Sequence, residues 1–331
     1  MLWLVLLTVF ALLLAAYFYG PRPPKVVIDR PPIKLEHSLE QLDLWLSKRE
    51  AALPIRPDNE ARIIWYADQQ QKTAYSIVYL HGFTASQGEG DPLHREFAAR
   101  YACNLYLNRM PGHGLTDPDA MLDLSPESML DNALEALAIG KTLGKKVILM
   151  GTSTGCTLML WLASRYPQDI AGLICFSPNI RVANPLMNWI DGPWGKQLVS
   201  ILNKGPYIHK RIRNQYWDSQ YREEALLALQ RLIRATMRPE VFRKIKLPVF
   251  MGYYFKNENF RDRVVSISAM LRMFTLLGTS RKQKRKVAFA EAGDHAFPNR
   301  HYGQDLESVR KESFAFAEEV MDLRPLVKNP Q

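Results

Sequence analysis

From about residue 60 onward, short apolar runs alternate with longer stretches of helical periodicity. The runs at 146–150 and 170–176 are almost continuously apolar, which is typical of parallel strands buried on both faces. One helical stretch begins at Ser125 and Pro126, an N-cap residue followed by a proline at the first helical position. The remaining strand candidates are residues 76–80, 104–107, 248–251 and 286–289. This alternation predicts an α/β fold with a mainly parallel central sheet flanked by helices.

One long segment, from about residue 181 to residue 246, interrupts the alternation. It combines helical patterning with many aromatic side chains, among them Trp189 and Tyr221, and carries much of the basic excess of the chain. Ligands of open α/β sheets bind at the carboxyl ends of the strands. We therefore expect this segment to be a helical cap inserted over those ends.

The first 19 residues contain no charged side chain, and 18 or more apolar residues in a row indicate a membrane-spanning helix. A cleavable signal peptide is the alternative, but the segment lacks a basic start and a small-residue cleavage site. We expect an uncleaved transmembrane anchor at residues 1–19. Arg22 and Lys25 follow this segment, which favours a cytoplasmic catalytic domain, although a large domain can override the rule and be periplasmic.

Residues 20–32 carry five prolines and predict a stiff, extended linker. The expected organisation is thus an anchor at 1–19, a Pro-rich linker and lead-in at 20–59, and one domain at 60–331 with the cap inside it.

The composition excludes some kinds of metal and disulfide site and bears on nucleic-acid binding. The chain has 331 residues, a formal net charge of +10 and three cysteines with no CxxC pair, which excludes a disulfide framework and a zinc ribbon. We expect no metal and no cofactor. The basic run at 281–286 is the one candidate for nucleic-acid contact, but no nucleic-acid motif accompanies it, and a solvated loop is the preferred interpretation.

The strongest motif is Gly-Thr-Ser-Thr-Gly at residues 151–155, which fits the pattern G-x-S-x-G. It follows the strand candidate 146–150 and precedes a helical run, the context that a nucleophile elbow requires. The alternative is a turn of small residues without function. We expect Ser153 to be a nucleophile and the glycines to permit the tight turn.

A serine nucleophile needs a base and an acid that orients the base. His295 follows the last strand candidate, and His301 is its nearest rival. The order serine, acid, histidine places the acid before His295. Asp262 is preferred there over Glu258, and Glu291 is a third candidate.

An acyl-transfer site also needs two hydrogen-bond donors for the oxyanion. The backbone N–H of Thr154 is one candidate, and the N–H of Phe83, just after the strand at 76–80, is the other. His81 precedes this loop and is expected to brace it.

These motifs together resemble the α/β-hydrolase superfamily, and most closely its carboxylesterase and monoacylglycerol-lipase-like branch, also described as the serine aminopeptidase S33 or Hydrolase_4 type. The segments that carry the resemblance are 81–83, 112–114, 151–155, 262–265 and 293–295. The resemblance implies a Ser153–Asp262–His295 triad, an oxyanion hole at Phe83 and Thr154, and a helical cap. The chain departs from the family where a bulkier residue often follows the serine and where Asn257 stands at a common position of the acid.

The resemblance implies hydrolysis of carboxylic esters through an acyl-enzyme. Together with an anchor and an aromatic, basic cap, it favours lipid-like esters such as monoacylglycerols or lysolipids over small soluble esters. An acyltransferase or an S33-type peptidase would use the same triad, and a non-catalytic membrane-tethered binding module is a further alternative. A peptidase would need a cap carboxylate to hold the substrate amine. The candidates for that role are Asp191, Asp218, Glu223, Glu224 and Glu240.

Overall fold

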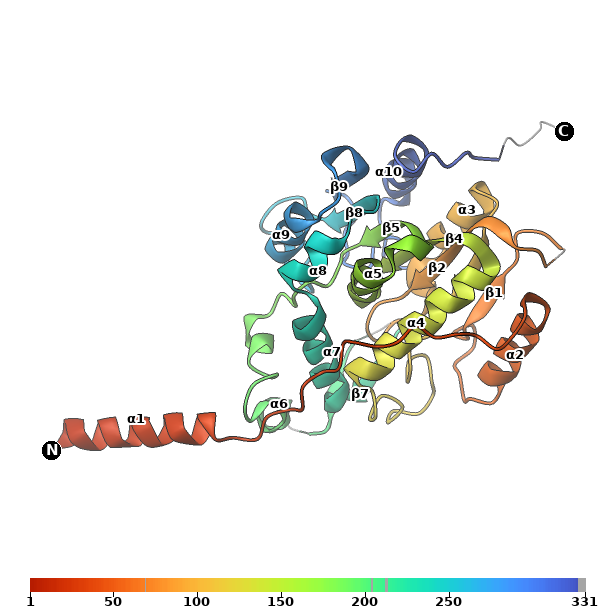
Figure 1. The fold of residues 1–331 in the computed structure, drawn as a ribbon. Coiled ribbons are helices and arrows are strands. Elements are labelled where there is room, and N and C mark those ends of the chain that lie inside the picture. Colours follow the sequence, from red (N-terminus) through yellow and green to blue (C-terminus); the bar gives the residue numbers. More distant parts are fainter. Residues whose placement is uncertain (69, 204, 212–213, 327–331) are drawn as a thin grey trace.

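The computed structural model describes residues 1–331 except 69, 204, 212–213 and 327–331 (Figure 1). Seven strands form one sheet in the order β1-β3-β2-β4-β5-β8-β9. All neighbouring strands are parallel except β1, which pairs antiparallel with β3. The strands are β1 (Arg62–Ile64), β2 (Thr73–Leu80), β3 (Asn104–Leu107), β4 (Gly144–Thr152), β5 (Ile170–Phe176), β8 (Val249–Tyr254) and β9 (Lys284–Phe289). The α/β-hydrolase fold predicted from the sequence is confirmed.

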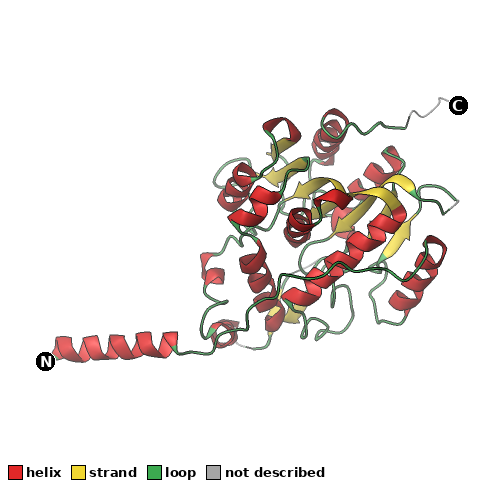
Figure 2. Ribbon diagram, viewed as in Figure 1, coloured by secondary structure: helices red, strands yellow, loops and turns green. Residues whose placement is uncertain are grey.

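Helices cover both faces of this sheet (Figure 2). In β4, Leu149 packs with the helices of one face, whereas its neighbours Ile148 and Met150 pack with those of the other. Successive side chains of a strand point to opposite faces, so burial of both faces accounts for the continuously apolar runs. The helices of the first face are α2 (Leu39–Ala51), α4 (Pro126–Leu143), α5 (Thr154–Arg165), α8 (Pro239–Lys244) and α9 (Ile267–Leu276), and those of the second are α3 (Leu93–Arg100) and α10 (Leu306–Glu319).

Ser125 caps α4 as predicted, because its hydroxyl accepts the N–H of Ser128 at 3.0 Å. Short 3₁₀ turns occur in the body of the domain and, for η3, in the cap. They are η1 (Gln87–Gly90), η2 (Pro167–Asp169), η3 (Pro185–Asn188) and η4 (Arg281–Gln283).

The segment expected to be a helical cap contains α6 (Gly195–Asn203) and α7 (Glu223–Thr236). It also contains a two-stranded antiparallel sheet that the sequence did not indicate, β6 (Tyr207–His209) with β7 (Gln220–Arg222). The cap contacts the loop after β2, since the N–H of Asp218 donates to the Thr84 carbonyl at 2.7 Å. It therefore lies against a loop at the carboxyl ends of the strands.

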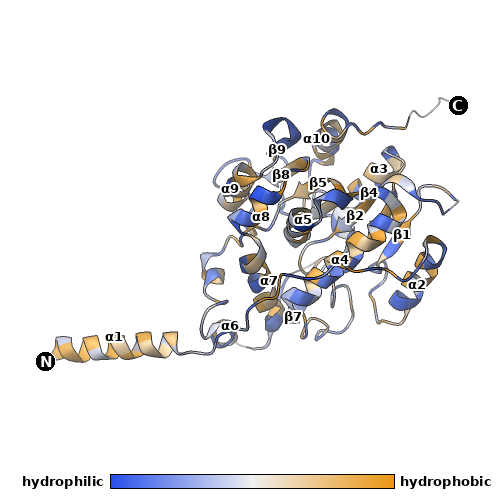
Figure 3. Cartoon of the chain, in the orientation of Figure 1, coloured by the Kyte–Doolittle hydropathy of each residue, from blue (hydrophilic) through white to orange (hydrophobic). Residues whose placement is uncertain are grey.

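At the N-terminus, α1 (Leu2–Phe18) projects away from the body of the domain (Figure 1), and it is apolar along its whole length (Figure 3). Among the residues that the structure describes, none of the helices combines the length and the apolar character needed to cross a membrane. The anchor at residues 1–19 stays a prediction.

The Pro-rich segment after α1 is extended, as its prolines predict, but it is not a free spacer. The N–H of Val27 donates to Glu127 of α4 at 2.9 Å, and Arg30 forms a two-pronged ion pair with Asp131 of the same helix. Within the lead-in expected at 20–59, α2 buries Leu42 in the main core. This part of the lead-in therefore packs against the domain.

Candidate active site

Ser153 occupies the sharp turn between β4 and α5. Its backbone has a φ of 53° and a ψ of −115°, a region that residues other than glycine rarely adopt. Two backbone hydrogen bonds hold this turn: the Ser153 N–H donates to Phe176 at 2.9 Å, and the Ser153 carbonyl accepts the N–H of Asn179 at 3.0 Å. The hydroxyl makes no hydrogen bond with any described residue, and the residue is 6% exposed. The turn thus presents an uncommitted hydroxyl at the carboxyl edge of the sheet.

The two glycines of the motif serve close packing rather than backbone conformation. A Cβ at Gly155 would lie 1.8 Å from the carbonyl oxygen of Leu80, and one at Gly151 would lie 2.5 Å from the same atom. Neither glycine has a positive φ, so the strained conformation falls on the serine itself. The glycines let the turn and α5 pass against the end of β2.

Asp262 and His295 meet directly. The Asp262 Oδ2 and His295 Nδ1 atoms are 2.6 Å apart, and the Asp262 side chain is fully buried. The other carboxylate oxygen accepts the N–H groups of Val264 at 2.8 Å and Val265 at 3.1 Å. Both oxygens of this carboxylate are thus hydrogen-bonded, and one of them orients the imidazole.

Burial and charge act in opposite directions on this pair. Burial raises the pKa of a carboxyl, but the charge and hydrogen bond of His295 and the two backbone N–H groups hold the pKa of Asp262 below its usual value. Burial lowers the pKa of an imidazole, but the charge and hydrogen bond of Asp262, with the carboxyls of Glu89 and Asp294, raise the pKa of His295 above its usual value. The pair therefore favours a charged imidazolium next to a carboxylate.

One serine links the histidine loop to the serine turn. The Ser177 hydroxyl donates to the His295 carbonyl at 2.8 Å, and Ser177 directly follows Phe176, whose carbonyl binds the Ser153 N–H. No hydrogen bond joins Ser153 to His295 within the described part of the chain. In unliganded enzymes such contacts often tighten only when substrate binds.

The rival residues lie elsewhere. His301 packs its ring against Tyr216, with ring centroids 5.0 Å apart. Glu258 is exposed and pairs with Arg261 at 2.9 Å. The third candidate acid, Glu291, is also exposed, and its ion pair with a lysine is 2.8 Å long. Of the candidate acids, only Asp262 contacts His295.

The predicted oxyanion donors are both available. The loop after β2 forms a turn in which the Ala85 N–H donates to the Gly82 carbonyl at 3.2 Å, with Thr84 at a φ of 63°. Neither the N–H of Phe83 nor that of Thr154, the first residue of α5, donates to a described acceptor. Both backbone N–H groups are thus without a described acceptor, so they can act as the hydrogen-bond donors that an oxyanion hole needs.

His81 braces this loop, as expected. Its Nε2 accepts the N–H of Met110 at 3.0 Å, so Nδ1 carries the proton and donates to the Gly82 carbonyl at 2.8 Å. Burial lowers the pKa of His81 to about 4, which keeps this tautomer neutral at physiological pH.

The sequence did not single out Glu89. This buried carboxylate accepts the N–H of Gly82 at 2.5 Å, and burial raises its pKa to about 7. Its charge is among those that raise the pKa of His295. The only sequence signal was an acid a few residues after the His-Gly pair, in a segment without apolar periodicity.

A second residue that the sequence did not single out is Lys210, which follows β6 of the cap. Its Nζ donates to the Thr84 hydroxyl at 3.0 Å and lies 5.1 Å from the ring centroid of Tyr221 and 5.9 Å from that of Phe83. Burial lowers the pKa of Lys210. The cap thus places a cation and an aromatic ring beside the oxyanion turn.

No group of three or more histidine, cysteine or acidic side chains in the described ranges has the geometry to hold a metal ion. The site consists of a serine, a histidine–carboxylate pair and backbone donors.

The comparisons with known proteins agree with this geometry. The sequence profile of the family described as "Serine aminopeptidase, S33" (Hydrolase_4) matches residues 71–246. Among curated proteins, no sequence matches the chain.

Solved structures share the fold at low sequence identity. One, from work on the metagenome-derived lipolytic enzymes LipS and LipT, is 17% identical with a TM-score of 0.62, over 79% of this chain and 98% of the other. The monoacylglycerol lipase of Paleococcus ferrophilus is 15% identical with a TM-score of 0.55, over 78% and 99%. A thermophilic esterase from Thermogutta terrifontis is 16% identical with a TM-score of 0.53, over 81% and 98%. The chain belongs to the serine aminopeptidase S33 family of the α/β-hydrolase superfamily and is a serine hydrolase.

Proposed function

We propose that the protein hydrolyses carboxylic esters through an acyl-enzyme formed on Ser153. The observation that carries this proposal is the 2.6 Å contact between Asp262 and His295 beside a serine turn with an uncommitted hydroxyl. The N–H groups of Phe83 and Thr154 are the proposed oxyanion donors.

In the first half of the reaction, His295 Nε2 takes the hydroxyl proton while Ser153 Oγ attacks the ester carbonyl. The oxyanion of the tetrahedral intermediate binds the two backbone N–H groups. His295 then gives its proton to the leaving alcohol, and the acyl group stays on Ser153. In the second half, a water loses its proton to His295 and attacks the acyl carbon, which releases the acid and restores the serine. Asp262 holds Nδ1 protonated and stabilises the imidazolium throughout.

We propose that α1 attaches the enzyme to a membrane. Its apolar side chains are largely exposed, and none of its 17 residues is charged. The cap next to α1 is also apolar on its surface. Trp189 is 60% exposed and Ile201 is 74% exposed. Because Trp194 of the cap donates to the Ala16 carbonyl at 2.8 Å, these two apolar surfaces adjoin each other and suit one lipid surface.

This arrangement supports a lipid-like ester, such as a monoacylglycerol or a lysolipid, as the substrate. The fold neighbours named above include a monoacylglycerol lipase and an esterase. Arg22 and Lys25 directly follow α1, and the positive-inside tendency favours a cytoplasmic position for the domain.

The carboxylates of the cap do not favour a peptidase, which would need one of them to bind the amine of the substrate. Most of them are engaged with a cation or a hydroxyl group, and Glu240 is exposed on α8. The contacts are Asp191 with Arg234, Asp218 with Arg56, Glu224 with Arg222, and Glu223 with the Ser200 hydroxyl. The side chain of Lys210 instead brings a cation to the oxyanion turn, where it donates to the Thr84 hydroxyl. An ester or an anionic substrate suits this environment better than an ammonium group.

The test uses the full-length protein in detergent with p-nitrophenyl esters from acetate to palmitate, followed by monoacylglycerol and lysophospholipid. We expect hydrolysis with a preference for long acyl chains, and loss of activity in Ser153→Ala. Ser164→Ala is the matched control, because Ser164 lies on the same helix and its hydroxyl contacts only the Trp161 carbonyl. A folded protein that hydrolyses no ester, or equal activity in Ser153→Ala, would contradict the proposal. A preference for acetate would contradict the lipid substrate alone.

A further inference from the structure

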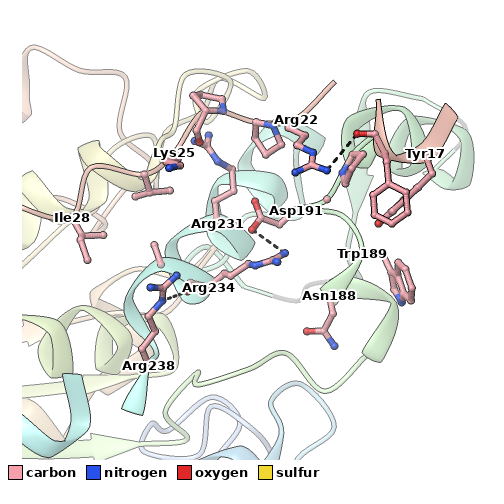
Figure 4. Close-up of a pocket in the computed structure, with 17 residues that line it drawn as sticks. Tyr17, Arg22, Lys25, Ile28, Asn188, Trp189, Asp191, Arg231, Arg234 and Arg238 are labelled. Atoms are coloured by element: carbon pink, nitrogen blue, oxygen red, sulfur yellow. Dashed lines mark hydrogen bonds and ion pairs between the residues drawn. The ribbon is translucent and has the colours of Figure 1, made fainter. Parts of the chain in front are cut away.

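The largest cavity among those described lies at the C-terminal end of α1 (Figure 4), and no residue of the serine turn lines it. It has a volume of about 1000 Å³. Three parts of the chain form its wall: the end of α1 with the extended segment up to Ile28, the cap around Trp189, and the second half of α7. We call it the basic cavity, for the five cationic side chains that line it. These are Arg22, Lys25, Arg231, Arg234 and Arg238.

The cations that line the basic cavity outnumber the carboxylates that line it. Among the described residues that line it, Asp191 is the single carboxylate, and it pairs with Arg234 at 3.5 Å (Figure 4). None of the other four cations forms an ion pair with a described carboxylate. Like charges gathered in one concave wall repel each other, so the site favours a bound anion.

The hydrogen bonds of the arginines leave donors available. Arg231 uses one terminal nitrogen for the Pro24 carbonyl at 2.7 Å, while its Nε is buried without a partner among the described residues. Arg22 contacts the Phe18 carbonyl at 3.4 Å, the last residue of α1. Guanidinium groups arranged in this way bind phosphate oxygens through paired N–H donors.

The rest of the wall is mainly apolar and continues the surface of α1. Tyr17 and Phe18 belong to the last turn of that helix, and the exposed Trp189 lines the cavity on the same side as Tyr17 (Figure 4). An anion that enters here therefore has an apolar path along α1 for acyl chains. A free phosphate would contact only the cations, whereas a phospholipid would contact the cations with its headgroup and the apolar surface of α1 with its acyl chains.

We propose that the basic cavity binds the phosphate headgroup of an anionic phospholipid. The inference rests on the proposed attachment of α1 to a membrane and adds a lipid preference to it. The bound headgroup would fix the domain against the bilayer with the cap facing the lipid, the orientation in which a lipid ester reaches the cap.

The experiment titrates the full-length protein, purified in detergent, with phosphatidylglycerol or phosphatidylcholine and counts retained lipids by native mass spectrometry. We expect phosphatidylglycerol to be retained in preference to phosphatidylcholine. The double variant Arg231→Gln with Arg234→Gln should bind it about 30-fold more weakly, which corresponds to about 2 kcal/mol for two basic side chains at an anionic lipid. Inorganic phosphate at millimolar concentration should not displace the lipid.

Two further variants make the result specific. Arg281→Gln with Lys282→Gln removes the same charge from the exposed turn η4 and should bind as the unaltered protein does. Lys25→Gln with Arg238→Gln removes two cavity cations that make few contacts with the fold, and it replaces the first variant if circular dichroism shows that the latter is unfolded.

Equal retention of both lipids, unchanged binding by the cavity variants, or displacement by inorganic phosphate would overturn the inference. The unaltered protein is tested in parallel for ester hydrolysis and for flotation with phosphatidylcholine vesicles. If the protein hydrolyses esters and floats with the vesicles but shows no headgroup preference, the headgroup site is refuted and the proposed function stands. If the protein floats with no vesicle, the proposed attachment fails with it.

Discussion

The substitution Asp262→Asn gives the sharpest prediction, because the two ends of this side chain have different partners. One oxygen accepts the N–H groups of Val264 and Val265, and the other faces His295 Nδ1 at 2.6 Å. In the variant, only the amide oxygen can accept the two backbone N–H groups, so the amide nitrogen must face His295. That nitrogen is a donor, and it forces Nδ1 to become an acceptor.

The ring proton then moves to Nε2, where the acceptor for the Ser153 proton is needed. We expect kcat to fall about 10⁴-fold, as the wrong tautomer does in other serine hydrolases, which corresponds to about 5 kcal/mol in the activation barrier. KM should change little, because Asp262 is buried behind the imidazole and does not contact the substrate.

The assay is p-nitrophenyl ester hydrolysis at saturating substrate, with thermal unfolding to show that the variant is folded. Glu258→Gln is the matched control, since this exposed acid pairs only with Arg261. A folded Asp262→Asn protein within tenfold of the parent would refute the reasoning, as would a comparable loss in Glu258→Gln.

Two further predictions concern the framework of the site. Gly155→Ala places a methyl group 1.8 Å from the Leu80 carbonyl oxygen, and we expect a loss of about 1–3 kcal/mol or more in the free energy of unfolding. Urea unfolding measures this, and a variant as stable as the parent would contradict the packing described. Glu89→Gln removes a negative charge that raises the pKa of His295, while its amide oxygen can still accept the Gly82 N–H. The imidazole must be neutral to act as a base, so the acid limb of kcat/KM should move to lower pH; an acid limb that stays in place would show that Glu89 does not act on His295.

Much of the fold could be predicted because its strands are buried on both faces. In β4 and β5 the buried positions are almost all apolar, whichever face they point to, so the runs are visible without knowledge of pairing. The serine turn was equally visible, because close passage of the β2 end demands glycine at both flanking positions.

The features that the sequence did not indicate depend on contacts between distant segments. The strands β6 and β7 are three residues each, too short for an alternating pattern. The segment after α1 is held by Arg30 and Asp131, 101 positions apart, so its composition alone predicted only an extended linker. Glu89 is buried by packing around the His-Gly loop, and no local pattern reports such burial.

The most direct test of the central claim is to label the full-length protein with a fluorophosphonate probe and locate the adduct by peptide mass spectrometry. We predict one adduct, on Ser153, that is absent from Ser153→Ala and strongly reduced in His295→Ala. An adduct on another serine, or none on a folded protein, would contradict it.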